Sequence, residues 1–565
     1  MNTRWHDAFD LSSVPVGGVK TLRHQDDRVA VFRLDDRVLH AVDDRCPHEG
    51  YPLSQGAVDG CTLTCCWHNW KFDLRDGACG KGGEDVRSYP VRVVDGRVQV
   101  DLSPPDPAAV LPKLWASLDE GLTRYEGGRT VRDAVRLLQA GVAPASIAAV
   151  AARHDARHAE WGATHGLAVA ADVLRWVDRY PGPRAAIPLA QALDVASYAH
   201  ARRPVRPVAD PVDPGDDPDA ARALLRAAVE AEDLPAAEGL LRGALARGWR
   251  GHVEAWLFGL CADHFLSFGH RLIYQVKVFD LLRAADWEHA DEILVGHLAG
   301  IVYGTREDVL PAWAGFRRRL ADLDLAALAT VRGQDPDWAD HEAVIEALLS
   351  GTPAQAFDGL VGAARAGAPW EALVDALSLA AAERMIRFDV AIDGDQSVQD
   401  NWLSVTHIQT HANAVRHALA RWNDPRAFRL LLFAARFVHH HRVLDGAERA
   451  PEPDPGTLAG LAAAIDAGHT TRAMALAAGA DPKALEPLWM DAAIADTSGR
   501  PIVQAHLIKG VVVAFEEHAA TGDARPLMAF AKLLAAPLQQ RWVQRRALEA
   551  VAFVTQGQIP RLLAP

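Results

Sequence analysis

Cys46-Pro47-His48 and Cys65-Cys66-Trp67-His68 are two short hooks of the forms C-x-H and C-x-x-H, separated by residues 49–64. Cysteine thiolates and histidine imidazoles bind iron–sulfur centres or zinc. Zinc sites more usually pair cysteine with cysteine and histidine with histidine, so the mixed order of these hooks favours iron. We therefore predict an iron–sulfur centre held by two thiolates and two imidazoles, with a zinc site as the alternative.

The residues after the second hook carry a family resemblance. The segment Trp70-Lys71-Phe72-Asp73-Leu74-Arg75-Asp76-Gly77 resembles the W-x-F-D-x-x-x-G segment of Rieske ferredoxins and of the Rieske domains of ring-hydroxylating oxygenases. The resemblance covers about residues 1–103. It implies a [2Fe–2S] cluster with two thiolates on one iron and two imidazoles on the other. The implied ligands are Cys46, His48, Cys65 and His68. The resemblance also implies that electrons leave through exposed imidazole edges.

The remaining cysteines do not suggest disulfides. Rieske domains of cytochrome complexes carry an additional, disulfide-bonded cysteine in each hook. Here Tyr51 occupies one of those places, and Cys66 stands one position early in the other. We therefore expect Cys61, Cys66 and Cys79 to be free and mostly buried thiols, as suits a reducing cell interior.

Composition and charge argue against several classes of function. The chain has a formal net charge of −14 and no basic cluster, which disfavours binding to nucleic acid or to an anionic membrane. Residues Met1–Asp10 are polar and do not resemble a signal peptide. No apolar run reaches the roughly 20 residues of a membrane span. We predict a cytoplasmic protein that binds neither nucleic acid nor membrane.

The chain of 565 residues is too long for a single core and changes character after about residue 105. Before that point, alternating apolar residues in 29–34 and 38–42, and again around Asp95-Gly96, predict antiparallel hairpins. After it, apolar residues recur with helical spacing. The predicted fold is therefore a small all-β Rieske domain followed by a large all-α domain. Their ranges are 1–105 and 106–565, with Pro/Asp-rich interruptions at 203–219 and 450–457.

The histidines of the helical region suggest a second metal site. His154, His158 and His165 share one face if their helix continues past Gly162, and neutral imidazoles spaced i, i+4 commonly hold a metal. His407 and His411 repeat the i, i+4 spacing. Further histidines stand alone in apolar surroundings, notably His264, His270, His297 and His506. The paired E-x-x-H of di-iron bundles is absent. The alternative is that each histidine is an ordinary core or surface residue. The candidate ligands of the second metal are His154, His158, His165, His270, His297, His407 and His411.

A second resemblance concerns this helical region. Residues 263–274 with His297 resemble the G-H-P-L-I-H segment of questin oxidase-like proteins, which are helical monooxygenases linked to Baeyer–Villiger-type ring opening of aromatic polyketides. Arg271 replaces the proline of that segment and Tyr274 replaces its second histidine. With residues 406–416, the resemblance covers about a third of the helical region. By contrast, the β-rich catalytic domain of ring-hydroxylating oxygenases has no counterpart in the sequence pattern.

Three hypotheses of function follow. In the first, the Rieske cluster passes electrons to a histidine-bound non-haem iron in the helical domain, which uses O₂ to oxidise an organic substrate. In the second, the protein only transfers electrons and its helical domain docks partners; in the third, it is a redox sensor. The first predicts buried, converging histidines, and the second predicts scattered, exposed ones. No glycine-rich dinucleotide fingerprint is present, so we expect a separate reductase or ferredoxin to supply electrons.

Overall fold

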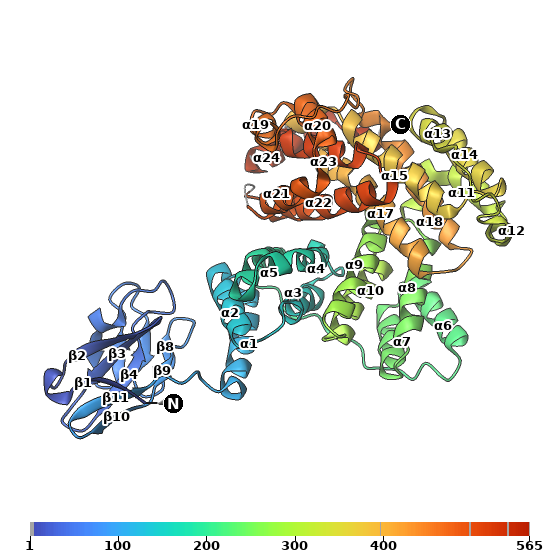
Figure 1. Cartoon of the computed structure of the whole chain (residues 1–565). Coiled ribbons are helices and arrows are strands. Elements are labelled where there is room, and N and C mark those ends of the chain that lie inside the picture. Colours follow the sequence, from blue (N-terminus) through green and yellow to red (C-terminus); the bar gives the residue numbers. More distant parts are fainter. Residues whose placement is uncertain (1–4, 396, 496–498, 539–541, 564–565) are drawn as a thin grey trace. The chain divides into compact units, whose positions relative to one another are not determined.

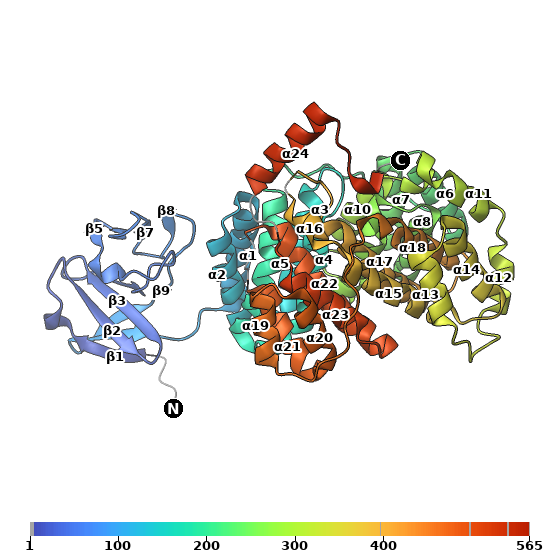
Figure 2. The same cartoon turned by 90° about the horizontal axis from the view of Figure 1, so that it is seen from above.

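The computed structural model describes residues 5–395, 397–495, 499–538 and 542–563. They form two compact units, Met1–Val142 and Ala143–Pro565. Figures 1 and 2 show the strands confined to the N-terminal part of the chain and helices in the rest. The predicted fold class, an all-β domain followed by a large helical part, is confirmed. The last strand ends at Asp101, and the first unit continues through two helices.

The β module contains three small antiparallel sheets. One sheet has the order β1-β11-β10, with β1 (Trp5–Asp10), β10 (Val91–Val94) and β11 (Arg97–Asp101). The second has the order β2-β3-β4-β9, with β2 (Val19–His24), β3 (Asp27–Arg33), β4 (Leu39–Asp43) and β9 (Ser88–Tyr89). The third has the order β5-β6-β7-β8, with β5 (Ala57–Asp59), β6 (Thr62–Thr64), β7 (Lys71–Asp73) and β8 (Cys79–Lys81). The predicted hairpins β3-β4 and β10-β11 are both present.

Strand β3 lies between two hydrophobic clusters, as its alternating sequence requires. Val29 and Val31 point into one cluster, while Ala30 and Phe32 point into the other. The second cluster also contains the cysteine of each hook. The thiols are therefore anchored in the core of the β module, whereas the histidines of the hooks extend toward its surface.

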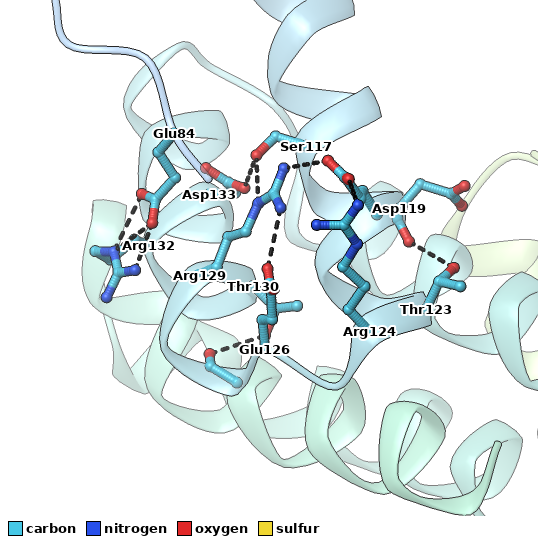
Figure 3. Close-up of polar contacts among 12 residues, drawn as sticks. Glu84, Ser117, Asp119, Thr123, Arg124, Glu126, Arg129, Thr130, Arg132 and Asp133 are labelled. Atoms are coloured by element: carbon cyan, nitrogen blue, oxygen red, sulfur yellow. Dashed lines mark hydrogen bonds and ion pairs between the residues drawn. The ribbon is translucent and has the colours of Figure 1, made fainter. Parts of the chain in front are cut away.

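Two helices, α1 (Pro107–Arg124) and α2 (Gly127–Gln139), complete the first unit. The carboxylate of Glu84, on the loop after β8, is buried and forms ion pairs with Arg132 and with Arg136 (2.5 Å) of α2. Figure 3 shows Glu84 beside Arg132, and Arg129 bonded to Ser117 of α1. Because a buried carboxylate without partners is costly, these pairs fasten the helical hairpin to the β module.

The second unit is helical. Its first half consists of α3 (Pro144–His158), α4 (His165–Asp172), α5 (Ala186–Ala199), α6 (Pro218–Glu230), α7 (Leu234–Ala246), α8 (Arg250–Asp263), α9 (His270–Ala284), α10 (Ala290–Val302), α11 (Ala314–Ala321), α12 (Leu325–Val331) and α13 (His341–Ser350). Its second half consists of α14 (Pro353–Arg365), α15 (Trp370–Arg387), α16 (Val390–Gly394), α17 (Trp402–Arg421), α18 (Ala427–His440), α19 (Leu458–Asp466), α20 (Thr470–Gly479), α21 (Pro482–Ile494), α22 (Pro501–Thr521), α23 (Arg525–Ala535) and α24 (Trp542–Gln556). The predicted Pro/Asp-rich interruptions coincide with the loops before α6 and α19.

Four helices form a closed ring in the interior of this unit. Helix α4 packs against α9, α9 against α17, α17 against α22, and α22 against α4. Helices α17 and α22 are buried on most sides, and the buried residues of α17 include several polar side chains. Within the described ranges, none of the helices has both the length and the apolar character that crossing a membrane requires.

Candidate metal centres

The two hooks have closely similar backbone conformations. In each, the cysteine N–H donates to the carbonyl five residues later: Cys46 to Tyr51, and Cys65 to Trp70, both at 2.8 Å. Each loop turns at a residue with positive φ, Gly50 (77°) in the first and Asn69 (60°) in the second. Two six-residue loops of the same kind thus present one cysteine and one histidine each.

The side chains of the hooks form a donor set of two thiols and two imidazoles. Nδ1 of His48 and Nδ1 of His68 face each other at 3.0 Å. Both cysteines are buried, and burial raises the pKa of the Cys46 thiol. A buried thiolate therefore needs a cation beside it, which iron provides. This donor set fits a [2Fe–2S] cluster of mixed cysteine and histidine ligation.

The aromatic surroundings of the hooks distinguish the two histidines. Trp70 stacks on the ring of His48 at 4.7 Å between centroids, and His48 is half-buried. The side chain of His68 is 41% exposed, beside the exposed Trp67. The imidazole edge of His68 is therefore the part of the donor set most open to an electron partner.

The other cysteines of the β module are free, as predicted. Their expected burial is wrong: Cys66 is exposed, and Cys61 and Cys79 are half-buried. Cys66 points outward because the second hook turns between Cys65, which enters the core, and His68. The turn at residues 66–68 thus carries the side chain of Cys66 away from the core that Cys65 enters.

The β fold and the two hooks define an iron–sulfur electron-transfer domain. Residues 4–90 match the model of the Rieske [2Fe-2S] domain family, and the chain belongs to this family through that segment. It is 46% identical over 77 residues to the anthranilate 1,2-dioxygenase ferredoxin subunit of Burkholderia cepacia, covering 13% of this chain and 69% of that subunit. Over 105 residues it is 29% identical to the whole naphthalene 1,2-dioxygenase ferredoxin component of Pseudomonas aeruginosa, covering 18% of this chain.

A larger relative matches over a segment of similar length. The 4beta-methylsterol monooxygenase of Methylococcus capsulatus is 43% identical over 102 residues, which is 16% of this chain and 27% of that enzyme. This chain thus spans about a quarter of the monooxygenase it matches. These relatives establish a domain that carries a [2Fe–2S] cluster, and they leave the helical unit to be interpreted from its own geometry.

The ring of helices α4, α9, α17 and α22 brings four histidines together. His165, His270 and His407 each offer a nitrogen, and these nitrogens lie within 4.8 Å of one another. His506 adds a fourth, because its Nε2 lies 3.1 Å from Nε2 of His407. We call these residues the four-histidine cluster. His407 and His506 are buried, and His165 and His270 are half-buried.

Backbone carbonyls determine which ring nitrogen of the cluster carries a proton. Nδ1 of His270 donates to the Ser267 carbonyl (2.5 Å), and Nδ1 of His506 donates to the Ile502 carbonyl (2.7 Å). Nδ1 of His407 donates in the same way to the carbonyl of Leu403. A carbonyl only accepts, so each Nδ1 is protonated and each Nε2 of these neutral rings presents a lone pair.

The Nε2 atoms point at one another without a donor between them. Nε2 of His407 and Nε2 of His506 are 3.1 Å apart, so two lone pairs face each other. Among the described residues, Nε2 of His270 and Nε2 of His165 have no hydrogen-bond partner. Burial lowers the pKa of His407 and of His506 well below the usual value, which disfavours a proton at this place. A single metal ion at this place would satisfy the lone pairs of His270, His407 and His506 at once.

A lysine completes the surroundings of the cluster. Lys509, one turn after His506 on α22, is buried, and its Nζ has no hydrogen-bond partner within the described part of the chain. Burial lowers the pKa of Lys509 to about 7. Sequence analysis missed Lys509 and did not include His506 among the ligands. The available signal was a single lysine within the apolar run of residues 507–513.

Several predicted ligands lie outside the cluster. The continuous helix expected past Gly162 is wrong: α3 ends at His158, Gly162 has a φ of 94°, and His165 begins α4. His154 and His158 instead stack on each other at 4.3 Å. Of the predicted set, His165, His270 and His407 come together, while His154, His158, His297 and His411 do not belong to the group.

His297 and His411 have other partners. Nε2 of His297 bonds to Oε1 of Gln275 at 2.8 Å, in the core between α9 and α10. Nδ1 of His411 lies 3.3 Å from the carbonyl of Gly269, next to the loop that precedes α9. His411 therefore supports the backbone around the cluster, although the i, i+4 spacing from His407 predicted a shared ligand role.

The loop before His270 has an unusual backbone. Ser267, Phe268 and Gly269 all have positive φ, at 49°, 59° and 82°. The carboxyl group of Glu307 accepts the N–H of Phe268 at 2.7 Å, which holds this conformation. A Cβ on Gly269 would lie 2.8 Å from Nδ1 of His411, so only glycine fits there. The loop aims the Ser267 carbonyl at His270.

The two departures from the questin oxidase-like segment have structural roles. The Tyr274 hydroxyl lies 3.2 Å from Nδ1 of His165, so this tyrosine orients a member of the cluster. The Arg271 guanidinium donates to the carbonyl of Ala163 at 3.1 Å, two residues before His165. Both residues therefore support the position of His165 at the start of α4.

Proposed function

We propose that this protein is an oxidoreductase in which the Rieske cluster passes electrons to a second metal in the four-histidine cluster, for O₂-dependent oxidation of an organic substrate. The proposed ligands of the [2Fe–2S] cluster are Cys46, His48, Cys65 and His68. The proposed ligands of the second metal are His165, His270, His407 and His506. The observation that carries the proposal is the convergence of four imidazoles from four helices, three of which present an Nε2 lone pair because a backbone carbonyl fixes the proton on Nδ1.

The chemistry of the donor set supports non-haem iron at the second site. Imidazole nitrogen suits iron, copper, nickel and zinc, and of these a redox-active metal can use electrons from a Rieske cluster to activate O₂. The protein's own contribution is positional. Backbone carbonyls fix the tautomers of His270, His407 and His506, and His407 and His506 are buried in the interior of the helical unit.

The N-terminal domain acts as the electron carrier in this proposal. A separate reductase or ferredoxin supplies its electrons, and the exposed imidazole edge of His68 is the proposed point of electron exchange. The resemblance to questin oxidase-like monooxygenases agrees with an oxidation in the helical unit. The electron-transfer alternative, in which the helical domain only docks partners, predicts scattered and exposed histidines, and the burial of His407 and His506 favours the enzyme.

The test is the metal and acid-labile sulfide content of the full chain. We expect two irons and two sulfides from the cluster plus further metal, which is lost in His407→Ala while the Rieske absorption spectrum persists. His297→Ala is the matched control, since His297 is a buried histidine of the same unit with its own partner, Gln275. Wild-type protein that holds only two irons and two sulfides after anaerobic purification contradicts the proposal and supports the electron-transfer alternative.

A further inference from the structure

The 264–269 loop, which directs the Ser267 carbonyl at His270, is paired with a second loop of residues 305–308. An antiparallel β-bridge joins the two loops. Beside it, the N–H of Ser267 donates to the carbonyl of Thr305 at 2.9 Å. Because the Ser267 carbonyl fixes the tautomer of His270, the order of this pair of loops determines how His270 presents its Nε2 to the four-histidine cluster.

The imidazole of His264 fastens the 264–269 loop at its start. Nδ1 of His264 lies 3.0 Å from Oδ2 of Asp308, in the 305–308 loop, and Nε2 lies 3.3 Å from the carboxylate of Glu230, the last residue of α6. Asp308 also accepts the backbone N–H of Phe265 at 3.1 Å. His264 therefore links its own loop both to the neighbouring loop and to a helix more than thirty residues earlier in the chain.

The protonation state of His264 decides whether both links exist. A carboxylate only accepts hydrogen bonds, so the ring donates to Asp308 and Glu230 together only as the doubly protonated imidazolium. Burial opposes this charge, but the hydrogen bond to Asp308 and the charges of Asp308 and Glu230 outweigh it and raise the pKa of His264. A neutral ring keeps one N–H, and its other nitrogen then turns a lone pair toward a carboxylate. Loss of the proton thus breaks one of the two links.

Other charged groups face His264 from the elements packed around it, and these groups pair with one another. The pairs are Asp263 with Arg226 and Arg429, Glu230 with Arg306, and the backbone carbonyl of Asp308 with Arg317. Glu307 is a further titratable group of the 305–308 loop, and it accepts the N–H of Phe268. Its ionisation must be removed before the effect of His264 can be measured alone.

We propose that His264 is a pH-dependent positioning residue, whose imidazolium holds the 264–269 loop to Asp308 and Glu230 and whose deprotonation loosens this loop and the hold on His270. The consequence for the second metal rests on the proposed function. The loosening of the loop does not, because it depends only on His264 and its two carboxylate partners. The two parts can therefore be tested separately.

The first experiment measures the order of the loop directly. Hydrogen exchange followed by mass spectrometry gives a protection factor for the peptide that contains residues 265–269, in the full chain with Glu307→Gln so that this carboxyl group does not titrate. Stabilisation by the His264 imidazolium is fully present below about pH 6.5 and is lost as the pH rises through the raised pKa of His264. We expect the protection factor to fall by roughly threefold or more between about pH 6 and 9, as suits one partly exposed ion pair. A protection factor that is constant over this range overturns the inference.

The second experiment assigns the fall to the proposed pair. We expect Glu230→Gln, added to the same chain, to keep the loop protected at every pH, because an amide both donates and accepts and so bonds to Nε2 in either protonation state. His264→Gln does not ionise and should also give a profile independent of pH. His252→Gln is the matched control, since His252 is exposed at the other end of α8 and should leave the fall intact. A fall that persists in Glu230→Gln overturns the inference.

The third experiment connects the loop to the metal centre. Competition with a chelator at the same pH values should show a few-fold weaker affinity for the second metal at high pH in the Glu307→Gln chain, and a smaller change once Glu230→Gln is added. Titration of Lys509 acts equally on both chains, so the comparison cancels it. If no second metal is bound but loop protection depends on pH and Glu230, the proposed function fails and the role of His264 in the loop stands. If the metal is bound and loop protection does not depend on pH, the role of His264 fails and the metal centre stands.

Discussion

The two candidate metal centres of this protein are assembled in opposite ways. The Rieske hooks take all their donors from two loops within residues 46–68, and one of their histidines is exposed. The four-histidine cluster takes one donor from each of four helices between residues 165 and 506 and encloses its nitrogens in the interior. A centre that exchanges electrons with partners needs a surface edge, whereas a centre that uses O₂ benefits from exclusion of water.

The largest expected effect concerns the Rieske hooks. Cys65→Ser removes one of the two buried thiols of the hooks and is expected to abolish the visible absorption and the reduced-state electron paramagnetic resonance signal of the [2Fe–2S] cluster. Serine oxygen is a poor substitute because iron–sulfur clusters depend on thiolate ligands. Cys66→Ser is the matched control: Cys66 is the next residue but is exposed. Loss of the spectrum in both variants contradicts the assignment of Cys65 alone.

The second prediction concerns the four-histidine cluster. His506→Ala is expected to lower the affinity for the second metal by at least tenfold and to leave the Rieske spectrum unchanged, since the removed ligand lies in the other unit. The measurement is competition with a chelator of known affinity. His154→Ala is the control, because His154 is a buried histidine that stacks on His158 outside the cluster. Equal loss in both variants contradicts the assignment.

The same contrast explains what the sequence could predict. The cluster ligands in the hooks could be predicted because each hook places its ligands within four residues, so that their spacing alone specifies the chemistry. The four-histidine cluster depends on which helices become neighbours, and helical periodicity does not encode that. The i, i+4 spacing paired His407, which lies in the four-histidine cluster, with His411, which lies outside it. Periodicity also linked His154 to His165 through Gly162, where the backbone has a φ of 94°.

The alternation of β3 and the D-G turn after β10 were predicted correctly for a similar reason. Strand faces and two-residue turns are set by neighbours in sequence. The place of His506 in the cluster could not be predicted because its neighbour His407 is 99 residues away in the sequence. The remaining signal of a site near His506 was Lys509, an isolated lysine in an apolar stretch of helix, because burial of a charged side chain is costly unless it is paired.

The third prediction tests the loop that aims His270. Partial burial, together with Asp308 next in the chain, raises the pKa of Glu307 to about 8, although the Phe268 N–H opposes this. The folded state therefore prefers the protonated acid. The contribution of Glu307 to the free energy of unfolding is fully present below about pH 4.5. It is lost as the pH rises through 8, by an amount on the order of a few kcal/mol.

We expect Glu307→Gln to flatten this part of the stability profile, because glutamine still accepts the Phe268 N–H but does not ionise. Urea unfolding of the full chain at several pH values between 5 and 8 measures the difference. Glu307→Ala removes the acceptor and is expected to weaken second-metal binding as well, whereas glutamine should preserve it. A wild-type profile that matches that of Glu307→Gln contradicts the raised pKa.

The smallest expected effect is that of Tyr274→Phe. The Tyr274 hydroxyl lies 3.2 Å from Nδ1 of His165, and this residue is 2% exposed, so the variant removes one buried hydrogen bond and little volume. A single neutral hydrogen bond contributes about 0.5–1.5 kcal/mol, which corresponds to a few-fold decrease in affinity for the second metal. The loss should be much smaller than that of His506→Ala, because His165 keeps its nitrogen but loses the group that orients it. Tyr303→Phe, a change at an exposed tyrosine of the same unit, is the control and should leave metal affinity unchanged. If Tyr274→Phe binds metal as tightly as wild type, His165 is positioned by helix packing alone, and the four-histidine cluster needs no side-chain support at this histidine.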